Sequence, residues 1–136
     1  MSSVSELKSF MVKQSILTES KTLTDSDSGR TFFLNVAGGL TVTLPSPRAG
    51  VRFEFIVKTA PTTAYIITSA TNIIVGGIYT SDINAEADSD FETSGVDVIT
   101  FTANRAKVGD RVEIESDGTN WFVRGFCGIN EAITLS

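Results

Sequence analysis

The chain has 136 residues, a formal net charge of −5, one cysteine and no histidine. This length predicts a single domain with a packed core, and a lone cysteine excludes a disulfide within the chain. Because nucleic-acid affinity depends largely on Lys and Arg that neutralise phosphates, the negative charge argues against a nucleic acid as partner. No apolar run is long enough to cross a bilayer, so we expect no membrane partner either. The N-terminal residues also lack the continuous apolar segment of a signal peptide, and we expect synthesis in the cytoplasm.

The absence of histidine also bears on enzymatic function. It removes the commonest general base and the commonest transition-metal ligand. Glycoside hydrolysis needs a carboxyl group with a raised pKa beside a second carboxylate. The carboxylates of this chain fall in turns or on polar strand faces, where the sequence predicts no desolvation. Cys127 has glycine and aromatic neighbours and is expected to be a packing residue. We therefore expect no enzymatic activity, no cofactor and no metal centre.

Two interpretations fit the N-terminal residues. Ser3 and Glu6 have the spacing of a helix capping box, which would bring several apolar side chains to one helical face. These side chains are Val4, Leu7, Phe10 and Met11. Alternatively, the apolar residues between positions 10 and 16 alternate as they would in an extended strand. We expect an N-terminal arm or short helix over residues 1–20, with strand-like residues near 12–17, and a β domain over residues 21–136.

From residue 21 onward, short segments that alternate in polarity or are rich in β-branched and aromatic residues predict β-strands. Pro45 and Pro47 end one segment, because proline cannot donate to a ladder, and Gly76 with Gly77 suggests a bulge or a corner in another. The expected strands span residues 21–24, 30–36, 40–44, 51–57, 64–68, 72–79, 96–102 and 132–135, together with a hairpin over 108–125. This pattern predicts an all-β fold, an antiparallel β-sandwich or tulip-like barrel.

The hairpin over residues 108–125 is the clearest strand pair. Apolar and charged residues alternate in its first strand, and Asp117 with Gly118 occupies the position of a tight two-residue turn that needs positive φ. Trp121 falls on the apolar face of the return strand, which predicts that its indole is a core anchor. Phe122 falls on the opposite face, where exposure would let it take part in a stacking platform with other aromatic residues.

One internal similarity links two parts of the chain. Residues 48–55 resemble residues 105–114, once a two-residue insertion is allowed in the second copy. Each copy follows an alternating strand, so the similarity predicts two related strand-turn-strand units that pack as halves of the fold. Chance similarity between two simple strand patterns is the alternative explanation.

Two acidic segments are candidate cation sites. The cluster at residues 25–29 lacks the later ligands of a calcium loop, so we interpret it as a solvated turn whose Asp and Ser side chains cap backbone donors. Residues 80–95 form the longest segment without apolar periodicity, and we expect an acidic loop there. Its irregular spacing favours a solvated loop, or a charged face that meets a basic partner, over a cation site. The carboxylates concerned are Asp82, Glu86, Asp88 and Asp90.

The order of motifs resembles that of a known class of β-modules. An Asp-Ser-Gly turn precedes an aromatic strand, T-V-T-L-P is followed by a glycine and a second strand, and S-D-G-T-N-W-F-V comes near the end. Over residues 22–126 this pattern is similar to small β-modules in the virion proteins of tailed bacteriophages. The resemblance implies a capsid decoration (cement) protein or a module of a tail fibre or spike, and it brings no active site.

The resemblance also implies partners and location. A chain that begins with Met1 and ends just past its last strand fits a free-standing decoration protein, so we expect a homotrimer on the major capsid protein, at the virion surface. The N-terminal arm and the acidic loop are then the expected contacts. The alternative is a receptor-binding module that recognises host surface glycans. It predicts exposed aromatic side chains around Phe122 or Tyr79.

Overall fold

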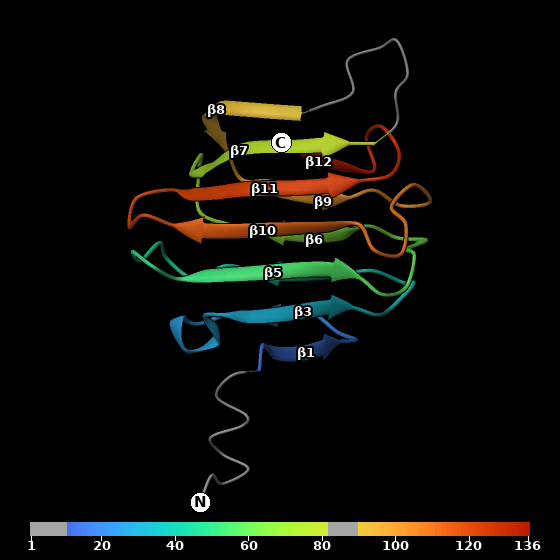
Figure 1. Cartoon of the computed structure of the whole chain (residues 1–136), viewed down its shortest axis with the longest axis horizontal. Helices are drawn as coiled ribbons and strands as arrows, with labels where there is room; N and C mark the ends of the chain where they lie inside the picture. Colours follow the sequence, from blue (N-terminus) through green and yellow to red (C-terminus); the bar gives the residue numbers. More distant parts are fainter. Residues whose placement is uncertain (1–10, 82–89) are drawn as a thin grey trace, which may run out of the picture.

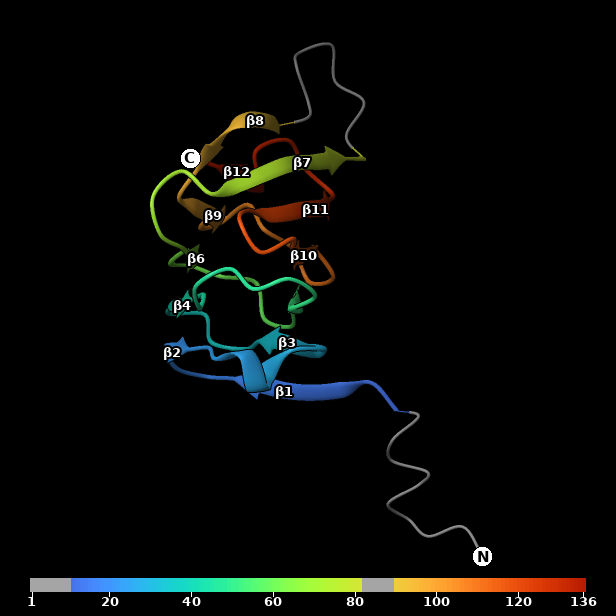
Figure 2. The same cartoon turned by 90° about the vertical axis from the view of Figure 1, so that its left-hand side faces the viewer.

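The computed structural model of the chain describes residues 11–81 and 90–136. Within these residues nearly all regular structure is extended, and the strands form two sheets that pack face to face, which confirms the expected all-β class. Figure 1 views the seven-stranded sheet face-on, and Figure 2 shows the two sheets as separate layers. The strands are β1 Lys13–Leu17, β2 Lys21–Thr22, β3 Arg30–Leu34, β4 Leu40–Thr43, β5 Arg52–Val57, β6 Tyr65–Thr68, β7 Ile74–Thr80, β8 Asp90–Val96, β9 Val98–Phe101, β10 Arg111–Ser116, β11 Trp121–Cys127 and β12 Ile133–Leu135, with a 3-10 turn, η1, at Asp25–Asp27.

The pairing is mixed rather than antiparallel, because the chain changes sheet after every strand from β1 to β7. The seven-stranded sheet has the order β1-β3-β5-β10-β11-β7-β8, and the five-stranded sheet has the order β12-β9-β6-β4-β2. When the chain passes through one strand of the opposite sheet and then returns, the next strand in the first sheet runs in the same direction as the previous one. The pairs β1–β3, β3–β5, β2–β4 and β4–β6 are therefore all parallel. The antiparallel pairing predicted from the sequence is wrong for this half of the fold.

The predicted hairpin is present as β10 and β11, which pair antiparallel between β5 and β7 (Figure 1). Its turn is longer than the two residues expected, since Ser116 pairs with Trp121 and four residues lie between them. The Asp117 carboxylate accepts hydrogen bonds from the backbone N–H groups of Thr119 and Asn120, both at 2.9 Å, and these bonds lower the pKa of Asp117. The turn is therefore held by its own aspartate.

The strand-like residues expected near 12–17 form β1, Lys13–Leu17, an edge strand of the seven-stranded sheet whose buried Leu17 side chain joins the core. At the opposite edge, β8, Asp90–Val96, lies mostly where a loop was expected over residues 80–95. An edge strand that buries little on either face has no clear polarity alternation, so the period-2 signal was weak in β8.

The space between the sheets is filled by the inward side chains of both. Trp121 is fully buried, as predicted for a core anchor, and its ring centroid lies 5.8 Å from that of Phe53. Phe32 and Phe55 stack with centroids 5.6 Å apart. The Tyr65 hydroxyl accepts from the Val36 N–H and donates to the Thr59 carbonyl, so this buried polar group is satisfied. The Trp121 indole N–H is buried without a hydrogen-bond partner in the part of the chain that the structure describes, and the rest of the core is formed by hydrophobic side chains.

The two similar segments of the sequence meet as the neighbouring antiparallel strands β5 and β10. Glu54 pairs with Glu113 at the centre of the ladder, and each end closes in the same way. The Gly50 N–H donates to the Ser116 carbonyl at 3.0 Å, and the Gly109 N–H donates to the Val57 carbonyl at 2.9 Å. The copies are thus related by a local two-fold axis within one sheet, rather than packing as halves of the fold.

We predict that this local symmetry extends to energetics. Gly50 and Gly109 have φ of 88° and 97°, and a Cβ added at either would meet no atom within 4 Å. Gly50→Ala and Gly109→Ala should therefore lower the free energy of unfolding through backbone strain alone, each by about 1 kcal/mol. Urea denaturation measures this loss. Gly38→Ala is the matched control, since Gly38 also has open space but lacks a positive φ, and an equal loss there would contradict the explanation.

Candidate binding surface

Aromatic side chains gather on the outer face of β7, β8 and β11. Along β11 the inward positions belong to the core, so the alternate positions point to solvent. Tyr79, Phe91, Phe122 and Phe126 are exposed by 48%, 63%, 50% and 52%. With the half-buried Val75 beside Phe122 in the register, they form what we call the aromatic surface. Arg124 stands between Phe122 and Phe126 on the same face of β11. A group of exposed aromatic residues of this kind is typical of an interaction site.

The aromatic surface is ordered by contacts among its own rings. Tyr79 and Phe126 are register partners on β7 and β11, and their rings stack with centroids 5.8 Å apart and planes 28° apart. Phe91 of β8 lies opposite Gly77, which sits between Val75 and Tyr79 on β7. A Cβ on Gly77 would come within 2.5 Å of the Phe91 ring, so the ring rests directly on the β7 backbone. The Phe91 ring therefore lies over β7 between the Val75–Phe122 pair and the Tyr79–Phe126 pair.

A groove of about 410 Å³ lies between Phe91 and Phe122. It exists because the β7–β8 register shifts: Ile74 pairs with Val96 and Gly76 with Glu92, so β8 uses four residues where β7 uses two. The glycine pair of β7 was expected to mark a bulge or a corner, and the register shift shows that it is a bulge. The groove is lined by Val75, Gly76, Phe91, Glu92, Thr93, Ser94, Asn120 and Phe122.

The charge around the groove is negative. Glu92 is half-buried in its lining, whereas no Lys or Arg belongs to that lining. The chain has no Lys or Arg between Lys58 and Arg105, a range that contains β7 and β8. On β11, Arg124 is the register partner of Gly77 and so lies on the same outer face as Phe91, and it donates to the Glu113 carboxylate of β10 at 2.6 Å.

A second cavity of about 430 Å³ lies on the outer face of β3, β5 and β10, and it contains a carboxylate pair. Glu54 and Glu113 face each other across the strands, with Arg30 and Arg52 also in the lining. Burial raises the pKa of Glu54, and the hydrogen bond and negative charge of Glu113 add to the increase. The hydrogen bond from Arg124 lowers the pKa of Glu113. This desolvation was not expected from the sequence, because the pair arises only from the β5–β10 pairing.

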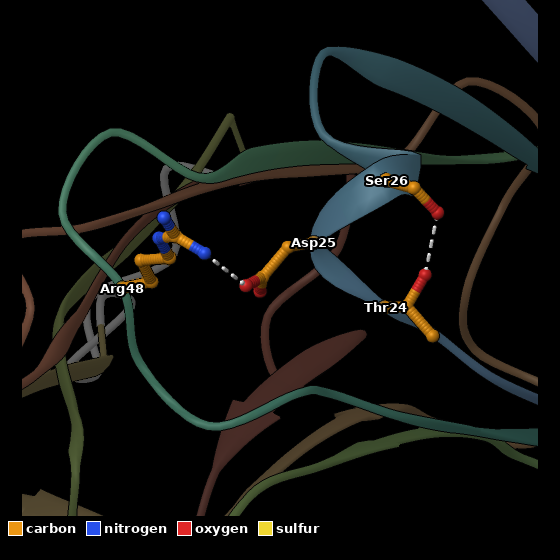
Figure 3. Close-up of polar contacts among 4 residues, drawn as sticks. All are labelled: Thr24, Asp25, Ser26 and Arg48. Atoms are coloured by element: carbon orange, nitrogen blue, oxygen red, sulfur yellow. Dashed lines mark hydrogen bonds and ion pairs between the residues drawn. The ribbon is translucent and has the colours of Figure 1, made fainter.

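The acidic turn over residues 25–29 has the structure expected of it. The Asp27 carboxylate accepts from the Thr24 N–H at 3.0 Å, and the Ser28 hydroxyl accepts from the Arg52 N–H at 3.1 Å. The Asp25 carboxylate pairs with Arg48 at 3.3 Å, and the Thr24 and Ser26 hydroxyls share a hydrogen bond (Figure 3). These side chains are engaged with the chain itself, which confirms the interpretation as a capped turn.

Two of the predicted partner-binding residues, Met11 and Asp90, lie among the described residues, and the structure does not bring them together. Met11 is 68% exposed, next to β1, whereas Asp90 is half-buried at the start of β8, at the opposite edge of the same sheet. The Asp90 carboxylate accepts from the Leu135 N–H at 2.7 Å, so it is tied to β12. Over residues 11–81 and 90–136, no three His, Cys, Asp or Glu residues gather to hold a metal ion. The others, which lie outside the described residues, are Val4, Leu7, Phe10, Asp82, Glu86 and Asp88.

The remaining buried reactive groups are structural. Cys127 lies in the core, burial raises the pKa of its thiol, and its Sγ donates to the Ile129 carbonyl at 3.3 Å. Burial also raises the pKa of Asp110, whose carboxylate accepts from the Lys107 and Gly128 N–H groups at 2.8 and 3.1 Å. Both groups hold loops in place.

The exposure of Phe122 and Tyr79 was anticipated from the sequence, but the role of Phe91 was not. Phe91 fell in the segment expected to be a loop, and the only signal that pointed to its position was the glycine pair on β7.

No protein-family model and no curated protein matches the chain. Among the described residues there is no helix of the length and apolarity needed to span a membrane.

The carboxylate pair generates a pH-dependent prediction. A raised folded-state pKa means that Glu54 contributes stability when protonated and loses it as the pH rises through that pKa. Glu54→Gln should therefore raise the free energy of unfolding at pH 7 by roughly 0.2–1 kcal/mol, and the gain should shrink in acid. Glu113→Gln should lower it at pH 7, because the lowered pKa of Glu113 reflects its bond to Arg124. Urea denaturation at several pH values checks both signs, and a loss for Glu54→Gln at pH 7 would refute the assignment.

Proposed function

We propose that the protein is a non-enzymatic capsid decoration protein of a tailed bacteriophage, which binds the outside of the assembled shell and stabilises it. The observation that supports the proposal is the aromatic surface, a group of four exposed aromatic side chains on one outer face of the domain. Isolated exposed apolar residues need no explanation, but stacked and register-aligned ones favour a protein partner. The motif order, which resembles that of phage virion modules, points to the same class.

This function requires binding and no chemistry. A protein that binds only the assembled shell stabilises that shell by mass action, by an amount that grows with its free concentration. A rigid, densely packed domain suits the task, because little conformational entropy is lost when it docks. The partner we propose is the major capsid protein, with the decoration protein acting as a homotrimer at the capsid surface.

The test is addition of the purified protein to expanded capsids that lack it. We predict a higher temperature of DNA release and saturable binding. The double variant Tyr79→Ser with Phe126→Ser should lose at least tenfold in affinity, since it removes the stacked pair at the surface. Val108→Ser is the control, because Val108 is 69% exposed but lies outside the aromatic surface. Absence of binding by the unaltered protein would disprove the function.

Exposed Phe122 and Tyr79 also favour a second candidate, a fibre or spike module that binds host surface glycans. Aromatic rings can stack against the apolar face of a sugar while polar neighbours bind its hydroxyls. This candidate predicts selective signals on a glycan array, which Phe122→Ala should abolish and Val108→Ala should retain. An array without signals would remove it.

A further inference from the structure

A row of mostly apolar residues crosses the outer face of the seven-stranded sheet. The cross-strand register aligns one outward residue on each of the six neighbouring strands from β1 to β7, which follow one another in Figure 1. We call this line the apolar row, and its members in order are Ile16, Phe33, Ile56, Arg111, Phe126 and Tyr79. Each has a buried neighbour in the sequence, so its own side chain points outward. Because adjacent strands lie about 4.8 Å apart, the row is roughly 24 Å long.

The apolar row differs sharply from the next row on the same face. Two residues away along each strand, the register aligns a second set of outward positions, which are polar apart from its glycine: Gln14, Thr31, Glu54, Glu113, Arg124 and Gly77. A sheet face in water is expected to have this polar composition. In the apolar row, by contrast, Ile16 is 58% exposed, and Phe33 and Ile56 are half-buried. Exposed apolar side chains that line up over several strands indicate an interaction surface.

The apolar row connects the aromatic surface to the opposite edge of the sheet. Tyr79 and Phe126, at one end of the row, are the stacked pair of the aromatic surface. Ile16, at the other end, lies on the edge strand β1. A partner that covers the stacked pair therefore meets a line of register neighbours that leads across the sheet to β1.

Arg111 is the one charged residue of the apolar row, and it lies between two hydrophobic members. In the part of the chain that the structure describes, its guanidinium belongs to no ion pair. Its charge lowers the pKa of Glu54, which burial raises, while the carboxylate of Glu113 is bound by Arg124. A guanidinium is best neutralised by a carboxylate, and one that is flanked by apolar side chains favours a carboxylate that is itself surrounded by apolar groups.

We propose that the apolar row is the line of contact with the protein partner, and that this partner places a carboxylate on Arg111 with hydrophobic side chains on either side of it. The aliphatic stem of Arg111 packs along the row while its head forms the ion pair. The inference rests on the proposed function, in which the partner is the major capsid protein. It extends the contact from the aromatic surface to β1 and specifies the chemistry of the complementary face.

The first experiment needs no capsid. Anilinonaphthalene sulfonate combines apolar rings with one anionic group, as proposed for the partner, and it binds exposed hydrophobic surface. We expect the folded protein to enhance its fluorescence saturably. Ile16→Ser and Arg111→Gln should each weaken dye binding by about threefold, and Arg111→Lys should restore most of it. Val12→Ser is the matched control, because Val12 is 66% exposed and close to β1 but lies outside the row.

Two outcomes of the dye experiment would contradict the inference. If Ile16→Ser and Arg111→Gln leave dye binding unchanged, or if Val12→Ser weakens it equally, the row is not a site for an apolar and anionic group. If deletion of residues 1–9 raises dye binding, the N-terminal residues of the chain itself occupy the row.

The second experiment measures binding to expanded capsids that lack the protein, with thermal melting as a check that the variants are folded. Ile16→Ser and Arg111→Glu should each lose about tenfold in affinity, although Ile16 lies at the end of the row away from the aromatic surface. Arg111→Lys and Val12→Ser should bind like the unaltered protein.

The capsid results separate the inference from the proposed function. If the double variant Tyr79→Ser with Phe126→Ser loses affinity but Ile16→Ser and Arg111→Glu do not, the contact is confined to the aromatic surface, so the inference is overturned and the proposed function stands. If the unaltered protein binds no capsid, the proposed function fails and the assignment of the partner fails with it. Self-association of the purified protein that Ile16→Ser abolishes would place a second copy on the row and would also overturn the inference.

Discussion

The fold depends on the antiparallel ladder between β5 and β10. On one side of it, the first six strands wind between the two layers; on the other side, β10, β11, β7 and β8 complete the larger sheet. Without this ladder the seven-stranded sheet would separate into two parts, each with an open edge. The ladder contains an unfavourable pair of carboxylates at its centre, and two glycines with positive φ close its ends. Its stability therefore comes from the aromatic core beneath it, where Phe53 and Phe55 meet Phe32 and Trp121.

The inward and outward faces of the larger sheet differ in burial and in the kind of side chain that they carry. Inward residues of β5, β10 and β11 are buried and determine stability, whereas outward residues change character along the sheet. Charged side chains dominate the outer face near β5 and β10, and aromatic ones dominate near β7, β8 and β11. This division places the aromatic surface near the edge opposite β1, away from the ladder that holds the fold together.

The sequence was sufficient to predict what each strand does locally. Polarity alternation located β5, β10 and β11, and it assigned Trp121 to the core and Phe122 to the surface. Alternation reports which face of a strand is buried, but it carries no information about the direction or identity of the neighbour. The parallel pairs and the Glu54–Glu113 contact follow from such neighbours, so they could not be predicted. β8 was missed because an exposed, bulged edge strand has no regular pattern, and the groove was missed with it.

The position of Phe91 on Gly77 has a consequence for how this protein can diverge. One wall of the groove comes from an edge strand that contributes little to the core, while its floor comes from a strand in the interior of the sheet. Substitutions along β8 can therefore reshape the groove at small cost in stability, whereas a side chain at Gly76 would meet the Val123 backbone and one at Gly77 would displace the Phe91 ring. Sequence changes would therefore be expected to accumulate in the β8 wall, while Gly76 in the floor stays unchanged. The outer edge of the sheet can then change shape while the scaffold stays constant.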